Sequence, residues 1–538
     1  MEEPNSLIEQ RKSKLAALRA QGLDPFKNKF SPTEKCAEAR ENYVEGREVA
    51  VAGRITAHRE MGKSIFIDVK DQSGRIQIYA QKNILGDEQW NIFTHLDLGD
   101  FIGVKGTMFT TKTGEISVKL GGAGVPTTGQ SDPPEKRKSP FVILGKALRP
   151  PPEKWHGVVD TEIRYRQRYL DLMANDEVKN IFLMRSAIVR EIRNFFHSRD
   201  FVEVETPLLQ PIPGGAAAQP FKTFHNALGS EFYLRIAIEL YHKRLLVGGI
   251  DKIFEIGKNF RNEGLSRKHN PEFTMLEAYE AFGDYATMME TVESLITSVA
   301  QKVLGTLKIE KGSARGPRAE SGGSPDSPST NSPSEKSDEQ NFRRAAENGM
   351  PAACAPQQTI DLTRPWKRAR YKDLIREKAG ADWFEITSTQ RRERAQKLGA
   401  EIGKEYEDFE VTGAIFEKLI EPTLIQPIFV THLPKELVPL AKLSSEDPTT
   451  VEVFECCING AEIAPGYTEQ NDSVAQRETL EHQAGGEQQK LDEDFLVALE
   501  HGMPPAGGIG IGIDRLCMML LGQESIRDVI LFPQMKPK

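Results

Sequence analysis

The pattern of apolar and polar positions changes near Arg47. Before it, in "SLIEQRKSKLAALRA", leucine and isoleucine recur at helical spacing among charged residues, which predicts an amphipathic helix. The stretch "GLDPF" then ends this helix, because glycine and proline interrupt helical backbone. After Arg47, β-branched and aromatic residues alternate with polar ones, which predicts strands with one buried face.

Five such runs follow at short intervals: "EVAVAGRI", "SIFIDVKD", "RIQIYAQK", "FIGVKGTMF" and "EISVKL". Turn residues such as "DQSG" and "TKTG" separate them, and a helical stretch, "EQWNIFTHL", follows the third run. This order fits an OB-fold, a small barrel whose open face binds single-stranded nucleic acid. We therefore expect a helical segment at 1–46 and an OB-fold β-barrel at 47–150.

Proline-rich and low-complexity stretches divide the rest of the chain. "GKALRPPPEKWHG" predicts a stiff connector, so residues 151–176 are expected to form a linker. Helical and strand patterns then fill 177–538, which predicts a second domain. Within it, residues 311–358 have almost no large apolar side chains and are predicted to be a disordered insertion. The stretch 121–140, rich in Gly, Pro and Ser, is expected to be an excursion from the barrel.

The composition is that of a multidomain globular protein. A chain of 538 residues exceeds one ordinary core, and 38% apolar with 28% charged residues is typical of soluble domains. The net charge of −8 excludes a uniformly basic surface, so any nucleic-acid surface must be regional. The five cysteines form no CxxC pair, which argues against a zinc site. With no stretch long and apolar enough to span a membrane, we expect a cytoplasmic protein.

A charged loop, "FRNEGLSRKHNPEF" at 260–273, lies between two predicted strands. It is either an ordinary solvated hairpin loop or a cationic loop that holds a polyphosphate. In the strand that follows, side chains alternate, so Glu277 and Tyr279 share one face with Phe273 and Met275. That face is either a solvated strand edge or the wall of a pocket beneath the loop cations.

Near the C-terminus, "AGGIGIGIDRLCMML" has glycine at alternate positions. One face of this strand therefore lacks side chains, and a flat group can lie against it. Arg515 follows at a predicted helix start, where a cation is electrostatically misplaced unless it stacks on something such as a nucleotide base. The spacing is not that of a dinucleotide-binding GxGxxG, and "MGKS" lacks the first glycine of a P-loop.

A third stretch, "FECCINGAEIAPGYTEQND", places Glu455 and Glu462 on either side of an "NG" turn, which predicts a hairpin. Two facing carboxylates suit Mg²⁺, which in enzymes also takes substrate phosphates. The alternative is a pair of surface acids with no ligand.

Taken together, these stretches resemble the class II aminoacyl-tRNA synthetases. "FRNEGLSRKHNPEF" resembles motif 2 of that class, "GIGIGIDR" motif 3, and "FVEVETPLL", which contains Pro207, the dimer-forming motif 1. "GGAAAQPF", "YLRIAIELYHKRLLVGG", "HNPEFTMLEAY" and "IRDVILFP" are similar to bacterial lysyl-tRNA synthetases. The implied fold is α+β and multidomain: an N-terminal OB-fold β-barrel, then a class II catalytic domain with an antiparallel sheet flanked by helices.

The resemblance implies a lysine–tRNA ligase that uses ATP, Mg²⁺ and L-lysine, aminoacylates tRNA(Lys) and forms a homodimer around Pro207. The catalytic residues would be Arg261, His269 and Arg515. The ATP-binding residues would be Arg261, Glu263, His269, Phe273 and Arg515, and the metal ligands Glu455 and Glu462. The lysine-binding residues would be Gly215, Glu239, Arg261, Glu277, Tyr279, Tyr467 and Glu469. The anticodon-binding residues would be Phe66, Gln77 and Glu115.

The chain departs from the family pattern at several positions. Pro465 replaces an asparagine and Ile238 a proline, while Lys268 and Ala461 each replace an arginine. Two alternatives therefore stay open beside an active ligase. One is an aspartyl or asparaginyl enzyme of the same subclass, although a pocket of Glu and Tyr suits a cationic substrate better. The other is a non-catalytic or weakened paralogue that binds tRNA.

Overall fold

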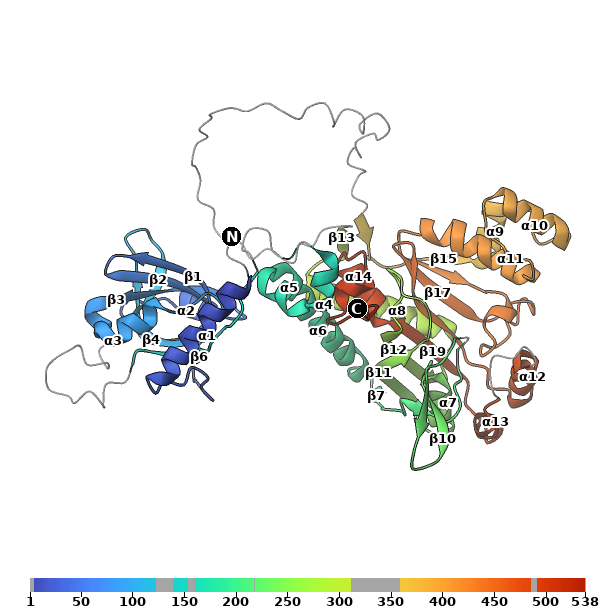
Figure 1. Cartoon of the computed structure of the whole chain (residues 1–538). Helices are drawn as coiled ribbons and strands as arrows, with labels where there is room; N and C mark the ends of the chain where they lie inside the picture. Colours follow the sequence, from blue (N-terminus) through green and yellow to red (C-terminus); the bar gives the residue numbers. More distant parts are fainter. Residues whose placement is uncertain are drawn as a thin grey trace, which may run out of the picture. The chain divides into compact units, whose positions relative to one another are not determined.

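The computed structural model describes residues 4–121, 139–152, 158, 160–216, 218–310, 359–484 and 491–537. Within these, the chain forms two compact units, 1–159 and 160–538 (Figure 1). The expected insertion at 311–358 lies outside the described residues, as do 122–138 of the expected excursion.

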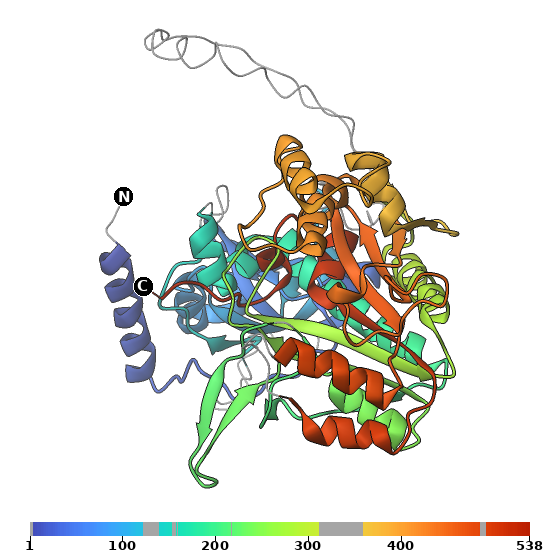
Figure 2. The same cartoon turned by 90° about the vertical axis from the view of Figure 1, so that its right-hand side faces the viewer.

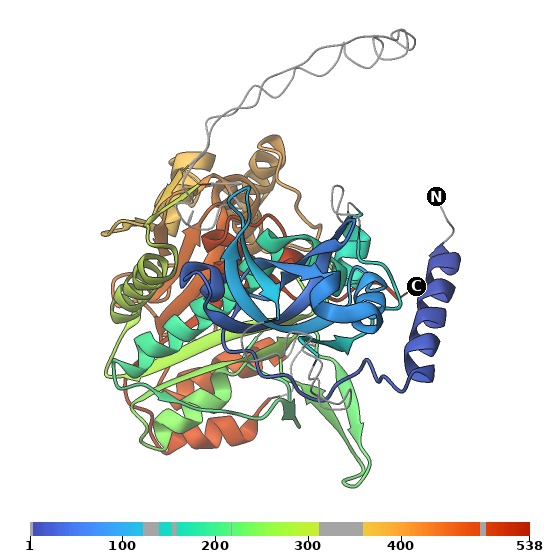
Figure 3. The ribbon, with the colours of Figure 1, turned by 90° about the vertical axis from the view of Figure 1, so that its left-hand side faces the viewer.

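Five strands of the first unit form a barrel (Figure 3). They are β1 (Glu48–Met61), β2 (Ser64–Lys70), β3 (Arg75–Gln81), β4 (Phe101–Thr110) and β5 (Ile116–Leu120). Their order is β1-β2-β3-β5-β4, and β1 also pairs with β4, which closes the sheet. Only the β3–β5 pair among these is parallel. With α3 (Lys82–Thr94) after the third strand, this topology confirms the predicted OB-fold.

The barrel core follows the predicted alternation. In β2, Ile65, Ile67 and Val69 are fully buried, whereas Phe66 is half-buried and lies outside the core cluster. A further strand, β6 (Phe141–Gly145), pairs with β4 and is not among the five predicted runs. The helical segment contains α1 (Pro4–Ala20) and the short α2 (Cys36–Glu41).

The second unit is built on an eight-stranded sheet in the order β15-β16-β17-β18-β19-β12-β11-β7. All pairs are antiparallel except β15–β16 and β11–β7. The strands are β7 (Val202–Glu203), β11 (Lys252–Phe260), β12 (Glu272–Ala281), β15 (Lys367–Arg370), β16 (Ile428–Thr431), β17 (Val453–Ile458), β18 (Ala461–Thr468) and β19 (Ala506–Gly512).

Helices cover both faces of this sheet (Figure 2). Apolar side chains of α6 (Asp176–His197), α8 (Tyr285–Leu304) and α14 (Ile513–Leu520) form the main core with Leu276 and Ala278 of β12. On the opposite face of β12, Tyr279 packs with α7 (Glu239–Val247) and α13 (Glu493–Glu500). A third core surrounds Trp383 with α9 (Tyr371–Ala379), α10 (Ser388–Lys397) and α11 (Asp408–Ile415). Among the described helices, none combines the length and apolarity needed to cross a membrane.

Smaller elements complete the second unit. A small sheet contains β8 (Leu209–Gln210), β9 (Lys222–His225) and β10 (Ser230–Leu234), and a separate pair consists of β13 (Lys308–Glu310) and β14 (Thr359–Asp361). The remaining α-helices are α4 (Thr161–Arg166), α5 (Arg168–Ala174), α12 (Ser473–Ala484) and α15 (Ile526–Val529). Three short helices of other types are η2 (Phe416–Ile420), η3 (Glu421–Thr423) and η4 (Lys435–Leu437).

The stretch expected to be a linker, 151–176, contains two of these helices. Arg168 of α5 is fully buried, and its guanidinium donates to the backbone oxygens of Arg527 (2.7 Å) and Leu531 (3.0 Å). The part of this stretch from residue 160 onward therefore packs with the C-terminal end of the chain.

A buried polar network ties the β7 region to β11. Nη1 of Arg235 donates to Oε1 of Glu255 (2.6 Å) and to the backbone oxygen of Thr206 (3.1 Å). The other carboxylate oxygen of Glu255 accepts from Oγ1 of Thr206 (2.7 Å) and lies 3.2 Å from Nε2 of His242. Burial alone would raise the pKa of Glu255, but hydrogen bonds from His242 and Thr206 and the charge of Arg235 lower it.

Replacing Arg235 by methionine should therefore unfold the second unit more easily. The variant leaves Glu255 buried without its guanidinium, which costs about 3–5 kcal/mol of unfolding free energy. Urea unfolding followed by tryptophan fluorescence measures the loss. The matched control is Arg193→Met, which removes the exposed pair with Glu203 and should cost less than about 1 kcal/mol. Equal losses in the two variants would contradict the prediction.

Candidate active site

The charged loop joins two antiparallel strands, β11 and β12, as predicted. Its two ends are held together by the backbone, with the amide of Arg261 donating to the oxygen of Pro271 (2.9 Å). Its far end is fixed from outside, because the amide of Ile526 donates to the oxygen of Arg267 (2.8 Å). Within the loop, Oγ of Ser266 lies 2.9 Å from Nδ1 of His269. The loop is therefore an ordered structure over the neighbouring strands.

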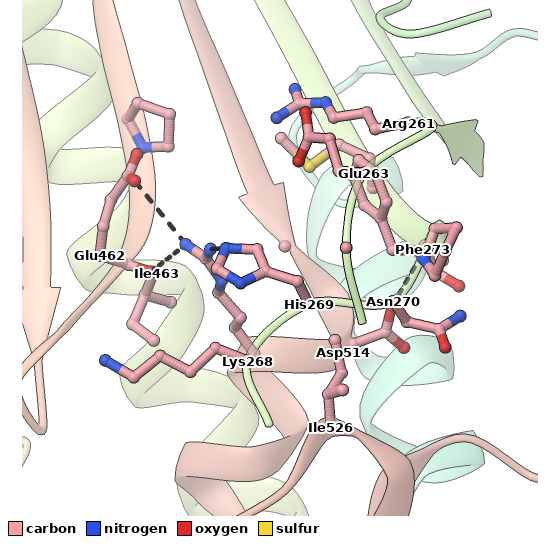
Figure 4. Close-up of a pocket in the computed structure, with 17 residues that line it drawn as sticks. Arg261, Glu263, Lys268, His269, Asn270, Phe273, Glu462, Ile463, Asp514 and Ile526 are labelled. Atoms are coloured by element: carbon pink, nitrogen blue, oxygen red, sulfur yellow. Dashed lines mark hydrogen bonds and ion pairs between the residues drawn. The ribbon is translucent and has the colours of Figure 1, made fainter. Parts of the chain in front are cut away.

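Beneath the loop lies a cavity of about 200 Å³, here called the cationic cavity (Figure 4). Its walls come from the loop, from β12, from β18 and from the start of α14. The lining side chains that bear on its chemistry are Arg261, Glu263, Lys268, His269, Phe273, Glu462 and Arg515. Three cations and one imidazole share this lining with three carboxylates, because Asp514 lines the cavity too. Asp514 is already paired with Arg185 (2.7 Å), a residue outside the lining, so the remaining charges favour an anionic ligand.

Arg261 is the most enclosed cation of this cavity. Burial lowers its pKa, while the carboxylates of Glu263 and Glu277 act in the opposite direction. Its guanidinium carbon lies 5.3 Å from the centre of the Phe273 ring. Its Nε is buried and has no hydrogen-bond partner among the described residues. A guanidinium left this way has donors available for a carboxylate or a phosphate.

Arg515 lies at the first turn of α14, as predicted, and crosses the cavity. Its Nη1 donates to the backbone oxygen of Glu462 (3.2 Å), and its Nη2 lies 3.2 Å from Nε2 of His269. The pKa of His269 is lowered, first by burial and then by the charge of Arg515. His269 is thus neutral at pH 7, and the charge at this end of the cavity belongs to Arg515 and Lys268.

The two carboxylates of the third stretch lie on a β-hairpin, as predicted. Asn459 and Gly460 both have positive φ, 58° and 69°, which is the geometry of a tight "NG" turn between β17 and β18. Burial raises the pKa of both Glu455 and Glu462, and the charge of Glu421 raises it further. A bound cation would lower these pKa values. No cluster of three or more His, Cys, Asp or Glu placed to hold a metal ion occurs in the described part of the chain.

A second group, here called the acidic pocket, consists of Glu239, Glu277, Tyr279, Tyr467 and Glu469. The three carboxylates are buried, with Glu239 and Glu277 6% exposed and Glu469 1% exposed. The hydroxyl of Tyr279 donates to Oε2 of Glu277 (2.9 Å), and that of Tyr467 to Oε1 of Glu239 (2.6 Å). The solvated strand edge considered for Glu277 is therefore wrong, because β12 is an inner strand of the sheet.

The bare face of β19 brings these side chains together. A Cβ atom on Gly508 would lie 2.0 Å from Oε1 of Glu469 and 2.7 Å from Cε1 of Tyr279. One on Gly510 would lie 2.9 Å from Cε of Met275, which lines the cationic cavity. The glycine face predicted from the sequence is thus filled by the protein's own side chains, which form both halves of the site.

The acidic pocket also holds a cation of its own. Nζ of Lys243, a fully buried residue of α7, lies 2.6 Å from Oε2 of Glu469 and 2.9 Å from Oε1 of Glu239. Burial on its own lowers the pKa of Lys243, but the charges of Glu469 and Glu239 outweigh it and raise the pKa. For Glu469, burial has the opposite effect and raises the pKa to about 8, although the charge of Lys243 opposes this rise.

On the barrel, Phe66 and Gln77 lie on the outer side of β2 and β3. Phe66 stacks on Tyr79 with ring centres 4.7 Å apart, and Oε1 of Gln77 accepts from Oγ of Ser117 (2.9 Å). The inner side of β2 carries the core, so Phe66 is not a residue of the barrel core. Glu115 is paired with Arg40 (3.0 Å) and with Arg75 (3.2 Å).

Comparison with known proteins identifies the family. Residues 160–536 match the family described as tRNA synthetases class II (D, K and N), and residues 49–122 match the OB-fold nucleic acid binding domain. The chain is 45% identical to a lysine–tRNA ligase of Carboxydothermus hydrogenoformans over 100% of the chain and 99% of the relative. It is 44% identical to that of Pelotomaculum thermopropionicum (100% and 96%) and 42% identical to that of Staphylococcus saprophyticus (100% of both). The chain belongs to the class II lysyl-tRNA synthetases.

In this synthetase, most of the residues suggested by resemblance lie in one of the two halves of the site. Gly215 lines a separate opening of about 400 Å³ together with Glu239 and Tyr467. The charge of Glu277 acts to raise the pKa of Arg261, so the acidic pocket and the cationic cavity interact electrostatically.

Sequence reasoning missed Lys243, although one signal for it was present. Lys243 follows Glu239 by four positions, and residues so spaced share one face where the segment is helical, as it is in α7. It also missed Arg40 of α2 and Arg75 of β3, since their partner Glu115 is far from both in sequence.

Two departures from the synthetase family pattern lie beside residues of the site. Ile238 stands before α7 without the expected proline, yet Glu239 still begins the helix and points to Tyr467 and Lys243. Pro465 lies in β18 opposite Glu455 and lines the cationic cavity. Because proline has no amide hydrogen and a short apolar ring, it offers this wall of the cavity no hydrogen-bond donor.

Adding one methyl group to the glycine strand should damage the acidic pocket of the synthetase selectively. In Gly508→Ala the new Cβ displaces Glu469 and Tyr279, so the KM for the amino acid should rise about tenfold or more while the KM for ATP changes little. Steady-state ATP–pyrophosphate exchange measures both. Gly413→Ala is the matched control, because no atom lies within 4 Å of a Cβ there. An unchanged amino-acid KM in Gly508→Ala would contradict this assignment of the pocket.

Proposed function

We propose that the chain is a lysine–tRNA ligase, which activates L-lysine with ATP to lysyl-adenylate and transfers the lysyl group to the 3′ end of tRNA(Lys). The observation that carries the proposal is the acidic pocket beside Arg261. It supplies three buried carboxylates where a dicationic amino acid would place its ammonium groups. The full-length identity with lysine–tRNA ligases supports the same activity.

In this proposal, the acidic pocket binds the amino acid. The carboxylate of Glu469 and the hydroxyl of Tyr279 receive the side-chain ammonium, while Glu239 and Glu277 lie nearer the α-ammonium. Oε1 of Glu469 is buried without a hydrogen-bond partner among the described residues, so it has acceptor capacity left. Arg261, with its unpartnered Nε, binds the carboxylate of lysine and the α-phosphate of ATP.

The cationic cavity binds ATP. Phe273 and Arg515, which line it together, sandwich the adenine ring, Glu263 meets the adenine edge, and His269 approaches the outer phosphates. Glu455 and Glu462 would hold Mg²⁺, which supplies charge neutralisation at the phosphates when bound, and a pair of carboxylates is a usual protein contribution to such a site. The pKa-raising repulsion between them fits a cation at this place.

Positioning and electrostatics account for the chemistry. The carboxylate of lysine attacks the α-phosphorus of ATP in line and pyrophosphate leaves. The terminal ribose hydroxyl of tRNA then attacks the carbonyl carbon of the mixed anhydride, which forms the lysyl ester and releases AMP. Arg261 contacts both reacting groups, so it aligns them and neutralises charge as it develops.

The barrel reads the anticodon in this proposal. Phe66 offers a ring on which a base stacks, and Gln77 and Glu115 offer hydrogen-bonding groups to base edges. The arginines paired with Glu115 add positive charge near the same face, which suits the phosphate backbone.

We also propose a homodimer through the region of Pro207. One exposed apolar side chain precedes Pro207 and two follow it: Val202 (50%), Leu208 (44%) and Leu209 (45%). Exposed apolar side chains gathered on one segment are typical of a protein–protein contact. Two copies of the same segment make the self-complementary contact of a twofold dimer.

Lysine-dependent ATP–pyrophosphate exchange tests the function. The purified full chain should exchange pyrophosphate with lysine and Mg²⁺, and not with aspartate or asparagine. Arg261→Met should reduce exchange about 100- to 1,000-fold, as for the loss of one preorganised donor at a developing charge. Arg267→Met, a cation of the same loop outside the cavity lining, should change it less than about threefold.

Chelation of Mg²⁺ should abolish exchange in both variants and in the parent chain. Absence of exchange at millimolar lysine, with tRNA still bound, would refute the ligase and leave the non-catalytic tRNA-binding paralogue.

Phe66 separates anticodon binding from amino-acid activation. Losing one stacked base costs about 1–3 kcal/mol, so Phe66→Ala should raise the KM for tRNA(Lys) about 5- to 150-fold in aminoacylation. Exchange without tRNA should stay unchanged. The control is Phe26→Ala, an exposed aromatic side chain of the same unit that lies outside the barrel strands. Equal effects of the two substitutions would contradict the assignment of Phe66.

A further inference from the structure

Lys243 is a cation buried where a cationic substrate is proposed to bind. The side chain has no exposed surface, and its ammonium donates to the backbone oxygen of Leu440 (3.2 Å) besides its pairs with Glu239 and Glu469. Its ring contact is with Tyr467, whose centre lies 5.8 Å from Nζ. The ammonium is therefore surrounded by the walls of the acidic pocket.

Stability alone is a weak reason for such an ammonium. Burying an ion pair costs desolvation energy that the attraction only partly returns, and apolar side chains of similar volume are often as stable. A structural ion pair would also use up the charge of its partners. Here Glu469 keeps its other oxygen, Oε1, without a hydrogen-bond partner among the described residues. The pair thus leaves one acceptor of Glu469, beside Gly508, without a partner in the part of the chain that the structure describes.

We propose that Lys243 is a positioning residue for the amino acid: a resident counter-cation that contacts Glu239 and Glu469, holds both side chains in place and favours the carboxylate form that the ammonium groups of the substrate need. This inference rests on the proposed specificity for lysine. Lys243 touches the two carboxylates and acts on the substrate only through them.

The charge balance of the pocket supports this assignment. With lysine bound and the three carboxyl groups ionised, one resident ammonium leaves two negative charges for the two ammonium groups of lysine, while Arg261 takes the lysine carboxylate. A protonated carboxyl group accepts an ammonium poorly, so binding favours the loss of any proton that the cluster carries. Without Lys243 the carboxyl groups would hold a proton more strongly, and binding would have to displace it.

The pH dependence follows from the groups that face this cluster. The groups from α7 are Glu239, His242 and Lys243, and those from β12 are Glu277 and Tyr279. Tyr467 of β18 and Glu469, which directly follows this strand, complete the set. Burial raises the pKa of Glu469 to about 8 and also raises that of Glu277, whereas Lys243 acts to lower the pKa of Glu469. The KM for lysine therefore rises as pH falls through the carboxyl pKa. Removing Lys243 moves this rise to higher pH.

The first test is Lys243→Met, which keeps the length of the side chain and removes its charge. Its lysine KM in ATP–pyrophosphate exchange should rise about tenfold or more at pH 7, with the midpoint of the KM–pH curve higher by about one unit or more. Turnover and the KM for ATP should change less than about threefold. The matched control is Arg244→Met, which removes the neighbouring ion pair with Asp492 (2.8 Å) and should leave the curve in place.

The second test separates charge from volume and does not depend on the methionine variant. Lys243→Ala leaves a buried space the size of a short alkylamine. Added propylammonium should lower the lysine KM of this variant, whereas 1-propanol of similar size should not. The same amine added to the parent chain measures its competition with lysine.

Two results would overturn the inference. One is a KM–pH curve of Lys243→Met that coincides with that of the parent chain. The other is a KM raised equally at every pH and equally insensitive to amine and alcohol, which is the behaviour of a merely structural side chain. A parent chain without lysine-dependent exchange would instead refute the proposed function, and that failure is visible before any variant is made.

Discussion

Three carboxyl groups share one buried pocket, and this electrostatic constraint shapes the catalytic unit. Glu239, Glu277 and Glu469 are each at most 6% exposed, so each has lost most of its hydration and repels the other two. Two phenol hydroxyls and one ammonium offset part of that cost. The cluster therefore lacks positive charge, and a ligand that brings ammonium groups is favoured over one that brings a carboxylate or an amide. Under the proposed function, this deficit of positive charge would set the selectivity among amino acids.

The backbone of β19 makes that cluster sterically possible. The oxygen of Glu469 and the ring of Tyr279 lie so close to Gly508 that a Cβ atom at this position would clash with both. The same strand leads directly into α14, so Arg515 leaves the sheet at the edge of the cationic cavity. One short segment thus fixes the distance between the acidic pocket and the cationic cavity. If these hold lysine and ATP as proposed, in-line attack depends on that distance, because reacting atoms must be held near contact.

Features that depend on local sequence were predicted well. The barrel strands, the "NG" hairpin of Glu455 and Glu462, the glycine face of β19 and the helix start at Arg515 each follow from turn residues or from alternation within a few positions. The residues of the site were reached through the resemblance of whole motifs, since no local pattern specifies that Glu277 lies on an inner strand.

Pairs between distant segments were not predicted. Lys243 and Glu469, or Arg235 and Glu255, meet only because the sheet brings α7, β11 and the end of β18 together. The same applies to β6, whose pairing with β4 depends on the closed barrel. A single sequence contains both residues of each such contact, but no pattern in it indicates which of the many charged residues meet in the fold.

The two departures near the acidic pocket differ in what replaces the missing residue. At Ile238, Tyr467 and Lys243 hold the following residue, Glu239, by side-chain contacts that do not depend on a proline turn. At Pro465 nothing equivalent is present: the ring lies close to Gly510 and supplies no donor to the cavity wall. A carboxylate bound there must find its hydrogen bonds elsewhere, and the unpartnered Nε of Arg261 is on the same cavity. Under the proposed function, the carboxylate of lysine would therefore depend on Arg261 for hydrogen bonds that Pro465 does not supply.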